Sequence, residues 1–216
     1  MPIFFQQDID VHTKLAVWKI GEDERFFLDS VPLQRSITHP HKRLQHLAGR
    51  YLLQYLFPDF PIRLIQIADT RKPFLKDEAY HFSISHCDEF AAVVVSRNKR
   101  VGVDIERCTE QAVRICNKFS TAEERAIMSF DDSDETTDDR EMMTLIWSIK
   151  EAVFKWYGLG EVDFRQHIVI ERSTRRPQSH FDTMVSFKKN EDRMLGLHSR
   201  VFDDVCLSYV VTDAIS

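Results

Sequence analysis

The stretch Val101-Gly102-Val103-Asp104-Ile105-Glu106 alternates like a β-strand, and the pattern of strands and helices begins again here. Successive side chains of a strand point to opposite faces, so Gly102, Asp104 and Glu106 share one face. Two carboxylates at this spacing repel each other unless water or a cation screens them. Oxygen ligands of this kind suit Mg²⁺, with Mn²⁺ as the alternative. The stretch therefore predicts either a metal-binding strand or a solvated strand edge.

A second stretch, WSIKEAVFK at residues 147–155, is predicted to lie on a long helix over residues 141–157. Helical spacing places Trp147, Glu151 and Lys155 on one stripe. One interpretation is an ordinary surface pair, because a Glu four residues before a Lys supports a helix. In the functional interpretation, Glu151 completes a metal site with the two strand acids, and Lys155 faces a phosphate one turn later.

The rest of the chain mixes short strands with helices. Before Val101, strands are predicted at residues 14–20, 64–68, 81–85 and 90–97, and a helix over residues 40–57 is ended by Pro58. After Val101, helices are predicted from about residue 111 and after Thr121, and strands at 167–172, 181–187, 195–202 and 206–212 indicate an antiparallel meander. The acidic run DDSDETTDD, residues 131–139, is interpreted as a solvated loop, with a cation site as the alternative. We expect an α+β fold.

Composition removes several classes of protein. A net charge of −5 over 216 residues argues against a nucleic-acid binder, which needs a cationic surface. The four cysteines form no CxxC pair, so we expect free thiols in a reducing cytoplasm. No apolar run is long enough for a membrane span, and the opening MPIFFQQDID has neither a basic flank nor an apolar core, so we expect a protein that is not exported. The one GxG, at residues 158–160, follows a helix and is interpreted as its C-cap, not as a phosphate loop.

A third group of residues could bind an anion. The strand HFSISH, residues 81–86, is predicted to point Ser83 and Ser85 away from the core and to deliver His86 at its end. A strand edge with capping polar groups is the alternative. Basic side chains that could contact phosphate, or could simply be solvated, are Lys42, Arg43, Arg50 and Lys72, the last before Pro73.

In their order along the chain, RKPFL (71–75), FSISHC (82–87), GVDIE (102–106), FSTAEE (119–124) and WSIKEAVFK (147–155) resemble the successive motifs of the Sfp-type 4′-phosphopantetheinyl transferases. The resemblance covers residues 42–160, and its two strongest parts are GVDIE and the W-S-x-K-E-A-x-x-K helix. The chain departs from the family pattern at Arg71, where the family usually has Gly, and at Cys87, where a serine is often found.

The resemblance implies a holo-[acyl-carrier-protein] synthase type enzyme. Such enzymes transfer the 4′-phosphopantetheine arm of coenzyme A to a serine of an apo acyl or peptidyl carrier protein and release adenosine 3′,5′-bisphosphate, in lipid or secondary-metabolite synthesis. The implied fold has two similar α/β lobes related by a pseudo-twofold axis, with the site in the cleft between them. We expect an N-terminal lobe over residues 1–99, a C-terminal lobe over residues 100–216, and a cytoplasmic monomer that binds neither nucleic acid nor membrane.

The resemblance also implies roles for individual residues. Asp104, Glu106 and Glu151 would hold Mg²⁺. Lys155 would bind coenzyme A and stabilise the leaving bisphosphate, and Glu151, Glu123 or a relayed water would take the serine proton. Coenzyme A would be gripped by Arg43, Arg50, Lys72, Pro73, Ser85 and His86. A carrier protein would dock near Arg114, Lys118 and the neighbourhood of residues 116–119.

Two other functions remain open from the sequence. One is a Mg²⁺-dependent hydrolase of a nucleotide diphosphate, because acids and a lysine beside a diphosphate could also activate water. The other is a module that binds coenzyme A or a carrier protein without catalysis.

Overall fold

The computed structural model describes residues 3–33, 37–129, 138–190 and 192–214. The chain divides into two compact units, Met1–Val101 with Asp213–Ser216, and Gly102–Thr212. The strand β7 (Lys99–Arg107) therefore crosses from the first unit into the second. The boundary expected between residues 99 and 100 falls at the start of this strand.

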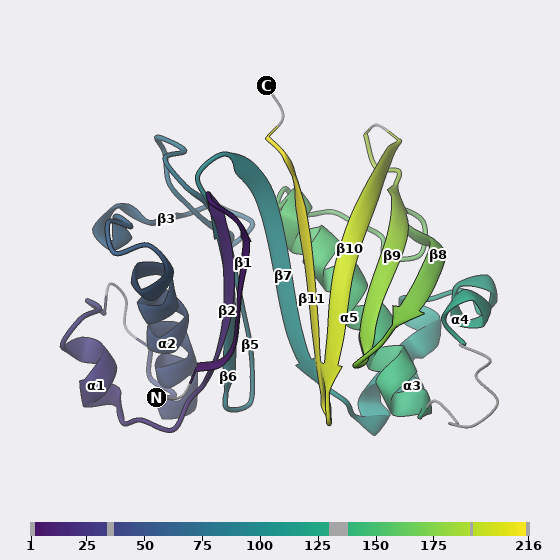
Figure 1. The fold of residues 1–216 in the computed structure, drawn as a ribbon, viewed down its shortest axis with the longest axis horizontal. Helices are drawn as coiled ribbons and strands as arrows, with labels where there is room; N and C mark the ends of the chain where they lie inside the picture. Colours follow the sequence, from purple (N-terminus) through teal and green to yellow (C-terminus); the bar gives the residue numbers. More distant parts are fainter. Residues whose placement is uncertain (1–2, 34–36, 130–137, 191, 215–216) are drawn as a thin grey trace. The chain divides into compact units, whose positions relative to one another are not determined.

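The first unit is built on an antiparallel sheet in the order β1-β2-β6-β5 (Figure 1). Its strands are β1 (Ile3–Asp10), β2 (Thr13–Lys19), β5 (His81–Cys87) and β6 (Phe90–Ser96). The helix α2 (Pro40–Leu56) packs its buried Leu47, Leu52 and Leu53 on one face of this sheet. Smaller elements are α1 (Glu24–Leu28), the 3-10 turn η1 (Ile62–Leu64), β3 (Gln66–Ile67) and β4 (Pro73–Phe74).

The second unit has the sheet order β7-β11-β10-β9-β8. The strands β8 (Ile168–Arg176), β9 (His180–Phe187), β10 (Arg193–Phe202) and β11 (Val205–Asp213) pair antiparallel in sequence order, which confirms the predicted meander. The helix α5 (Asp139–Tyr157) lies along this sheet (Figure 1). The short elements α3 (Glu110–Ile115), η2 (Cys116–Lys118) and α4 (Ala122–Met128) lie between β7 and α5 in the chain.

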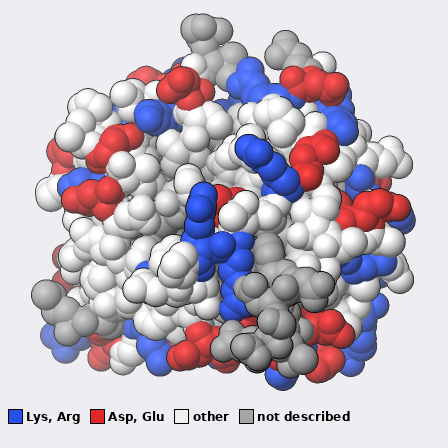
Figure 2. Space-filling view, turned by 45° about the vertical axis from the view of Figure 1, so that its right-hand side comes forward, with Lys and Arg blue, Asp and Glu red and all other residues white. Residues whose placement is uncertain are grey.

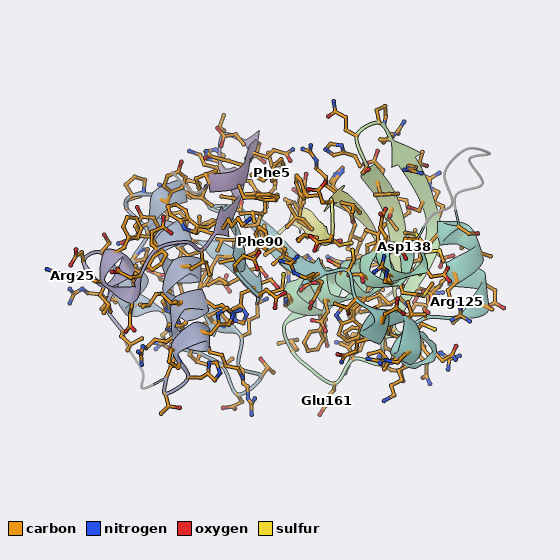
Figure 3. All side chains as sticks on the ribbon, turned by 90° about the horizontal axis from the view of Figure 1, so that it is seen from below. Phe5, Arg25, Phe90, Arg125, Asp138 and Glu161 are labelled. Carbon is orange, nitrogen blue, oxygen red and sulfur yellow. The ribbon has the colours of Figure 1, made fainter. Side chains whose placement is uncertain are left out.

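The ends of α5 follow from its flanking residues. The Asp138 side chain accepts a hydrogen bond from the Arg140 amide and caps the start of the helix. Gly158, at φ 74°, ends it in the left-handed conformation that glycine adopts without strain, as the sequence predicted. Figure 3 labels Asp138 at the start of α5 and Glu161 in the loop beyond its end.

One predicted strand is wrong, and two elements of the first unit were not predicted. The strand predicted at residues 64–68 is wrong for most of its length, because a 3-10 turn occupies Ile62–Leu64 and only Gln66–Ile67 pairs with β4. The strand β1 and the helix α1 were not predicted; β1 is an edge strand with many exposed side chains, so its apolar alternation is weak. Residues 131–137 of the acidic run lie outside the described residues, so its interpretation as a loop or cation site is not tested there.

Charge is spread over the surface in view. Figure 2 shows acidic and basic side chains interspersed on one face, with several basic side chains gathered near its middle. None of the helices in the described part of the chain is long and apolar enough to cross a membrane.

Candidate active site on β7 and α5

The position of the site is decided by a close contact between β7 and α5. A β-carbon built on Gly102 would lie 2.2 Å from the backbone oxygen of Ala152 and 2.7 Å from the backbone nitrogen of Trp156. Only glycine fits there, because real β-carbons do not approach backbone atoms so closely. The strand face that carries Gly102 and Asp104 is therefore covered by α5, and Asp104 is only 1% exposed. The solvated strand edge considered for Asp104 is wrong.

Lys155 forms the central ion pair of this site. Its Nζ lies 2.5 Å from Asp104 Oδ1. Burial lowers the pKa of Lys155, but attraction by Asp104, Glu151 and Glu106 outweighs this and leaves the pKa above its ordinary value. Lys155 therefore carries a positive charge across the physiological pH range. The ion pair of Lys155 is with Asp104 on β7, which argues against a simple surface pair with Glu151 on its own helix.

Burial and the charges of Asp104 and Lys155 also change the pKa values of the other two predicted acids, Glu106 and Glu151. Burial, followed by repulsion from Asp104, raises the pKa of Glu151 to about 7, against the attraction of Lys155. Burial and Asp104 likewise raise the pKa of Glu106 to about 7, although Lys155 and a hydrogen bond with Trp147 oppose the shift. The strand acids and the helix acid are thus electrostatically coupled to one another and to Lys155, whereas the sequence predicted that Lys155 faces a phosphate.

The chemistry of this donor set fits a divalent cation. When ionised, the carboxylates of Asp104, Glu106 and Glu151 face a single ammonium, so negative charge is in excess. Carboxylate oxygens are the ligands that Mg²⁺ prefers in proteins. Within the described ranges, however, no three His, Cys, Asp or Glu side chains are grouped so that they could hold one ion as placed.

A buried network that the sequence interpretation missed lies beside the site. Lys150 Nζ is 2.6 Å from Glu124 Oε1 and donates to the backbone oxygens of Phe164 and Ile168 at 2.8 and 2.7 Å. Glu124 accepts from the Ile170 amide at 2.9 Å and, with its other oxygen, from the Thr121 amide at 2.9 Å. The network joins α4, α5 and β8, and it fixes the helix turn that presents Glu151.

Two sequence signals pointed toward this network. The capping box of Thr121 and Glu124 was visible in the sequence and is present at the start of α4. Lys150 stands between buried apolar residues of α5, and its own side chain is 0% exposed. Glu123, one of the candidate bases, is exposed, and hydrogen bonds with the backbone and with Thr121 lower its pKa.

Lys72 and Pro73, two of the residues predicted to bind phosphate, lie in the first unit at the start of β4. Lys72 is half-buried, and burial together with nearby Arg100 lowers its pKa to about 8. It follows Arg71, whose φ of 66° is a conformation that favours glycine. Pro73 then begins β4. A glycine would adopt this φ without strain, so the backbone here suits the Gly that the resemblance leads us to expect before Lys-Pro.

The serines and His86 of β5 are divided by burial. Ser83 and Ser85 lie on the sheet face opposite Phe82 and Ile84, away from the core under α2, as predicted, yet they are only 4% and 5% exposed. His86 is exposed. The serines are therefore not part of a solvated strand edge.

The basic residues of α2 are held by partners within the first unit. Arg43 pairs with Glu24 at 2.6 Å and donates to the backbone oxygen of Ile37. Arg50 is 6% exposed, and its Nη1 lies 3.1 Å from His46 Nδ1. Lys42 is exposed.

The region expected to dock a carrier protein is only partly at the surface. Arg114 and Lys118 are exposed. Phe119 is 1% exposed and stacks edge-on against Trp147, with ring centroids 5.1 Å apart, so it belongs to the core.

The strand and the covering helix that carry these coupled carboxylates and the lysine lie in the part of the chain that matches a known family. The chain belongs to the 4′-phosphopantetheinyl transferase superfamily, whose family model matches residues 100–210. That region begins in β7 and contains the whole Asp104–Lys155 site.

Individual relatives agree with this family. The chain is 33% identical over 120 residues to enterobactin synthase component D of Salmonella typhi, covering 54% of the chain and 49% of that protein. It is 34% identical over 125 residues to a 4′-phosphopantetheinyl transferase of Aneurinibacillus migulanus, covering 53% of the chain and 46% of that protein. The chain thus spans about half the length of these relatives. With enterobactin synthase component D of Escherichia coli O157:H7 it shares 32% identity over 153 residues, covering 65% of the chain and 71% of that protein.

Proposed function

We propose that this chain transfers the 4′-phosphopantetheine arm of coenzyme A to a serine of an apo carrier protein and releases adenosine 3′,5′-bisphosphate. The observation that carries the proposal is the ion pair between Lys155 and Asp104, 2.5 Å apart, whose lysine is also attracted by Glu151 and Glu106. In such a group the carboxylates can bind a divalent cation while the lysine binds a phosphate of the diphosphate, and this reaction needs both.

In the proposed reaction, the serine oxygen bonds to the phosphorus that carries the pantetheine arm. The bond from that phosphorus to the oxygen of the adenosine bisphosphate breaks, and the serine proton goes to a base. Asp104, Glu106 and Glu151 would hold Mg²⁺, which supplies charge neutralisation at the diphosphate. The Lys155 ammonium would bind the leaving bisphosphate, because its raised pKa keeps it charged.

Glu151 and Glu123 remain the two side chains proposed as the base. Burial raises the pKa of Glu151 to about 7 without a metal ion, whereas Mg²⁺ bound to this carboxylate would lower the pKa and make Glu151 a weaker base. The lowered pKa of Glu123 makes that carboxylate a weaker base, although its exposure leaves it open to a carrier protein.

We propose that residues of the first unit bind coenzyme A. The lowered pKa and burial of Lys72 support its use, since a desolvated ammonium gains more from binding phosphate than a solvated one. Pro73, Ser85, His86 and Arg50 are proposed beside it. Arg43 has weaker support because Glu24 already neutralises it.

The fold and partners proposed here go beyond the family assignment. We propose an Sfp-type enzyme with two lobes related by a pseudo-twofold axis and a site between them. In support, each unit by itself is an antiparallel sheet with one long helix on a face. The relatives' names mention enterobactin synthase, which favours a carrier of secondary-metabolite synthesis as the acceptor. A monomeric state and a cytoplasmic location stay predictions.

The experiment is to incubate the chain with coenzyme A, Mg²⁺ and an apo peptidyl carrier protein and to weigh the intact carrier. The transferase proposal expects a mass gain of one phosphopantetheine, which Glu151→Gln abolishes and the exposed control Glu161→Gln retains. Hydrolysed coenzyme A with an unchanged carrier would support the hydrolase alternative. Binding without either product would support the non-catalytic alternative.

A further inference from the structure

Two cysteines far apart in the sequence lie together in the second unit. The Sγ atoms of Cys108 and Cys206 are 3.5 Å apart, although 98 positions separate them in the chain. Cys108 directly follows β7, and Cys206 is the second residue of β11. None of the four cysteines, Cys87, Cys108, Cys116 and Cys206, is part of a disulfide.

The backbone around the pair holds the two sulfurs in register. The Cys108 amide donates to the backbone oxygen of Asp204 at 2.7 Å. The neighbouring Arg107 forms an ion pair with the Asp204 side chain. These contacts fix the end of β7 beside the turn that leads into β11, so closing the gap between the sulfurs needs only a local side-chain and backbone adjustment.

The two thiols differ in access. Cys108 is half-buried, whereas Cys206 is 0% exposed. The Cys206 Sγ also lies 3.9 Å from the backbone oxygen of Glu141 on α5. An oxidant from solvent therefore reaches the Cys108 sulfur first. The Cys206 sulfur is close enough to react with the oxidised Cys108.

We infer that Cys108 and Cys206 are an oxidisable dithiol that forms a reversible intramolecular disulfide. With hydrogen peroxide as the oxidant, the Cys108 sulfur attacks one peroxide oxygen, the O–O bond breaks, and Cys108 becomes a sulfenic acid as water leaves. The Cys206 sulfur then attacks the Cys108 sulfur, the S–O bond breaks, and the hydroxide leaves as water with the Cys206 proton. Two thiols and one peroxide thus give one disulfide and two waters.

The disulfide would tie the end of β7 to the start of β11. Because the closed loop would contain most of the second unit, it restricts the unfolded chain strongly. The oxidised protein is therefore expected to unfold at a higher temperature than the reduced protein. A thiol reductant should reverse the change.

The test treats the full chain with a small excess of hydrogen peroxide, followed by alkylation, intact mass measurement and peptide mapping. We expect a loss of two hydrogens and a crosslinked peptide that contains Cys108 and Cys206. Cys108→Ser should abolish this product, while the matched double variant Cys87→Ser/Cys116→Ser should keep it and its rise in melting temperature.

Several results would overturn the inference. They are oxygen addition without a crosslink, a crosslink between other cysteines, or an unchanged product in Cys108→Ser. The peptide map of the wild-type protein shows whether the Cys108–Cys206 disulfide forms even if a variant fails to fold. Since no readout uses transferase activity, the result is independent of the proposed function.

Discussion

The backbone oxygen of Ala152 lies where the β-carbon of any other residue at position 102 would have to go, 2.2 Å from an ideal β-carbon on Gly102. This contact brings α5 down onto β7 and allows Lys155 to reach Asp104 across the two elements. The glycine of the GVDIE motif is thus a requirement of packing, and the acids of the same motif depend on it.

Gly102→Ala should force β7 and α5 apart. We expect a loss of about 1–3 kcal/mol in the free energy of unfolding, measured by denaturant titration, and a loss of carrier modification. Gly196→Ala on β10 is the matched control, because its β-carbon would have no described atom nearer than the Met184 sulfur at 3.9 Å. Equal stability of the two variants would contradict the packing argument.

Lys150→Met should be among the more damaging changes in the second unit. It leaves the Glu124 carboxylate buried without its ion-pair partner, which costs about 3–5 kcal/mol in comparable buried pairs. Lys188→Met, in an exposed pair with Glu171, should change the free energy of unfolding by less than about 1 kcal/mol. Adding Glu124→Leu to Lys150→Met should recover part of the loss, and a purely additive double variant would count against the pairing.

The raised pKa values of Glu106 and Glu151 predict how stability depends on pH without added metal. The folded protein keeps these protons up to about pH 7, whereas the unfolded chain releases them near the ordinary value of 4.5. Between these pH values the folded state binds more protons, so the free energy of unfolding falls as the pH rises. Each unit of pKa shift is worth about 1.4 kcal/mol.

Denaturant titrations from pH 4.5 to pH 8 measure this dependence. Glu151→Gln should flatten the slope between about pH 5 and pH 7, while the exposed Glu161→Gln should leave it unchanged. Mg²⁺ affinity should rise over the same interval, because the cation binds the ionised carboxylates. A stability that increases with pH across this range would contradict the assignment.

Substitutions at Arg71 test whether the positive φ at this position favours glycine. Arg71→Gly removes the strain of φ 66° but gives the unfolded chain more freedom, so the free energy of unfolding should change by less than about 0.5 kcal/mol. Arg71→Val should lose at least about 1 kcal/mol, because a β-branched residue is strained at positive φ. Chemical denaturation of the two variants distinguishes these outcomes.

Local sequence patterns predicted the strand and helix that carry the site. Period-two alternation located β7, helical spacing located α5, and Pro58 and Gly158 ended their helices where expected. These features succeed because they depend on residues close together in the chain. That Asp104 and Glu151 share a site was one of two interpretations of these stretches, and the resemblance favoured it.

The environment of each side chain was harder to predict. Burial of Ser85 and Asp104 depends on what covers each sheet face, which no local pattern records. The pairing of Arg43 with Glu24 and of Lys150 with Glu124 joins residues from different elements. The sequence therefore indicated which charged residues could form a site, but it did not predict which of them are neutralised by an ion-pair partner.

The most direct test of the central claim is the intact mass of an apo carrier protein after incubation with coenzyme A, Mg²⁺ and either wild-type chain or Asp104→Asn. The account predicts a phosphopantetheine gain with the wild type and at least a hundredfold slower gain with the folded variant. An unmodified carrier with the wild type, or equal rates for both proteins, would contradict it.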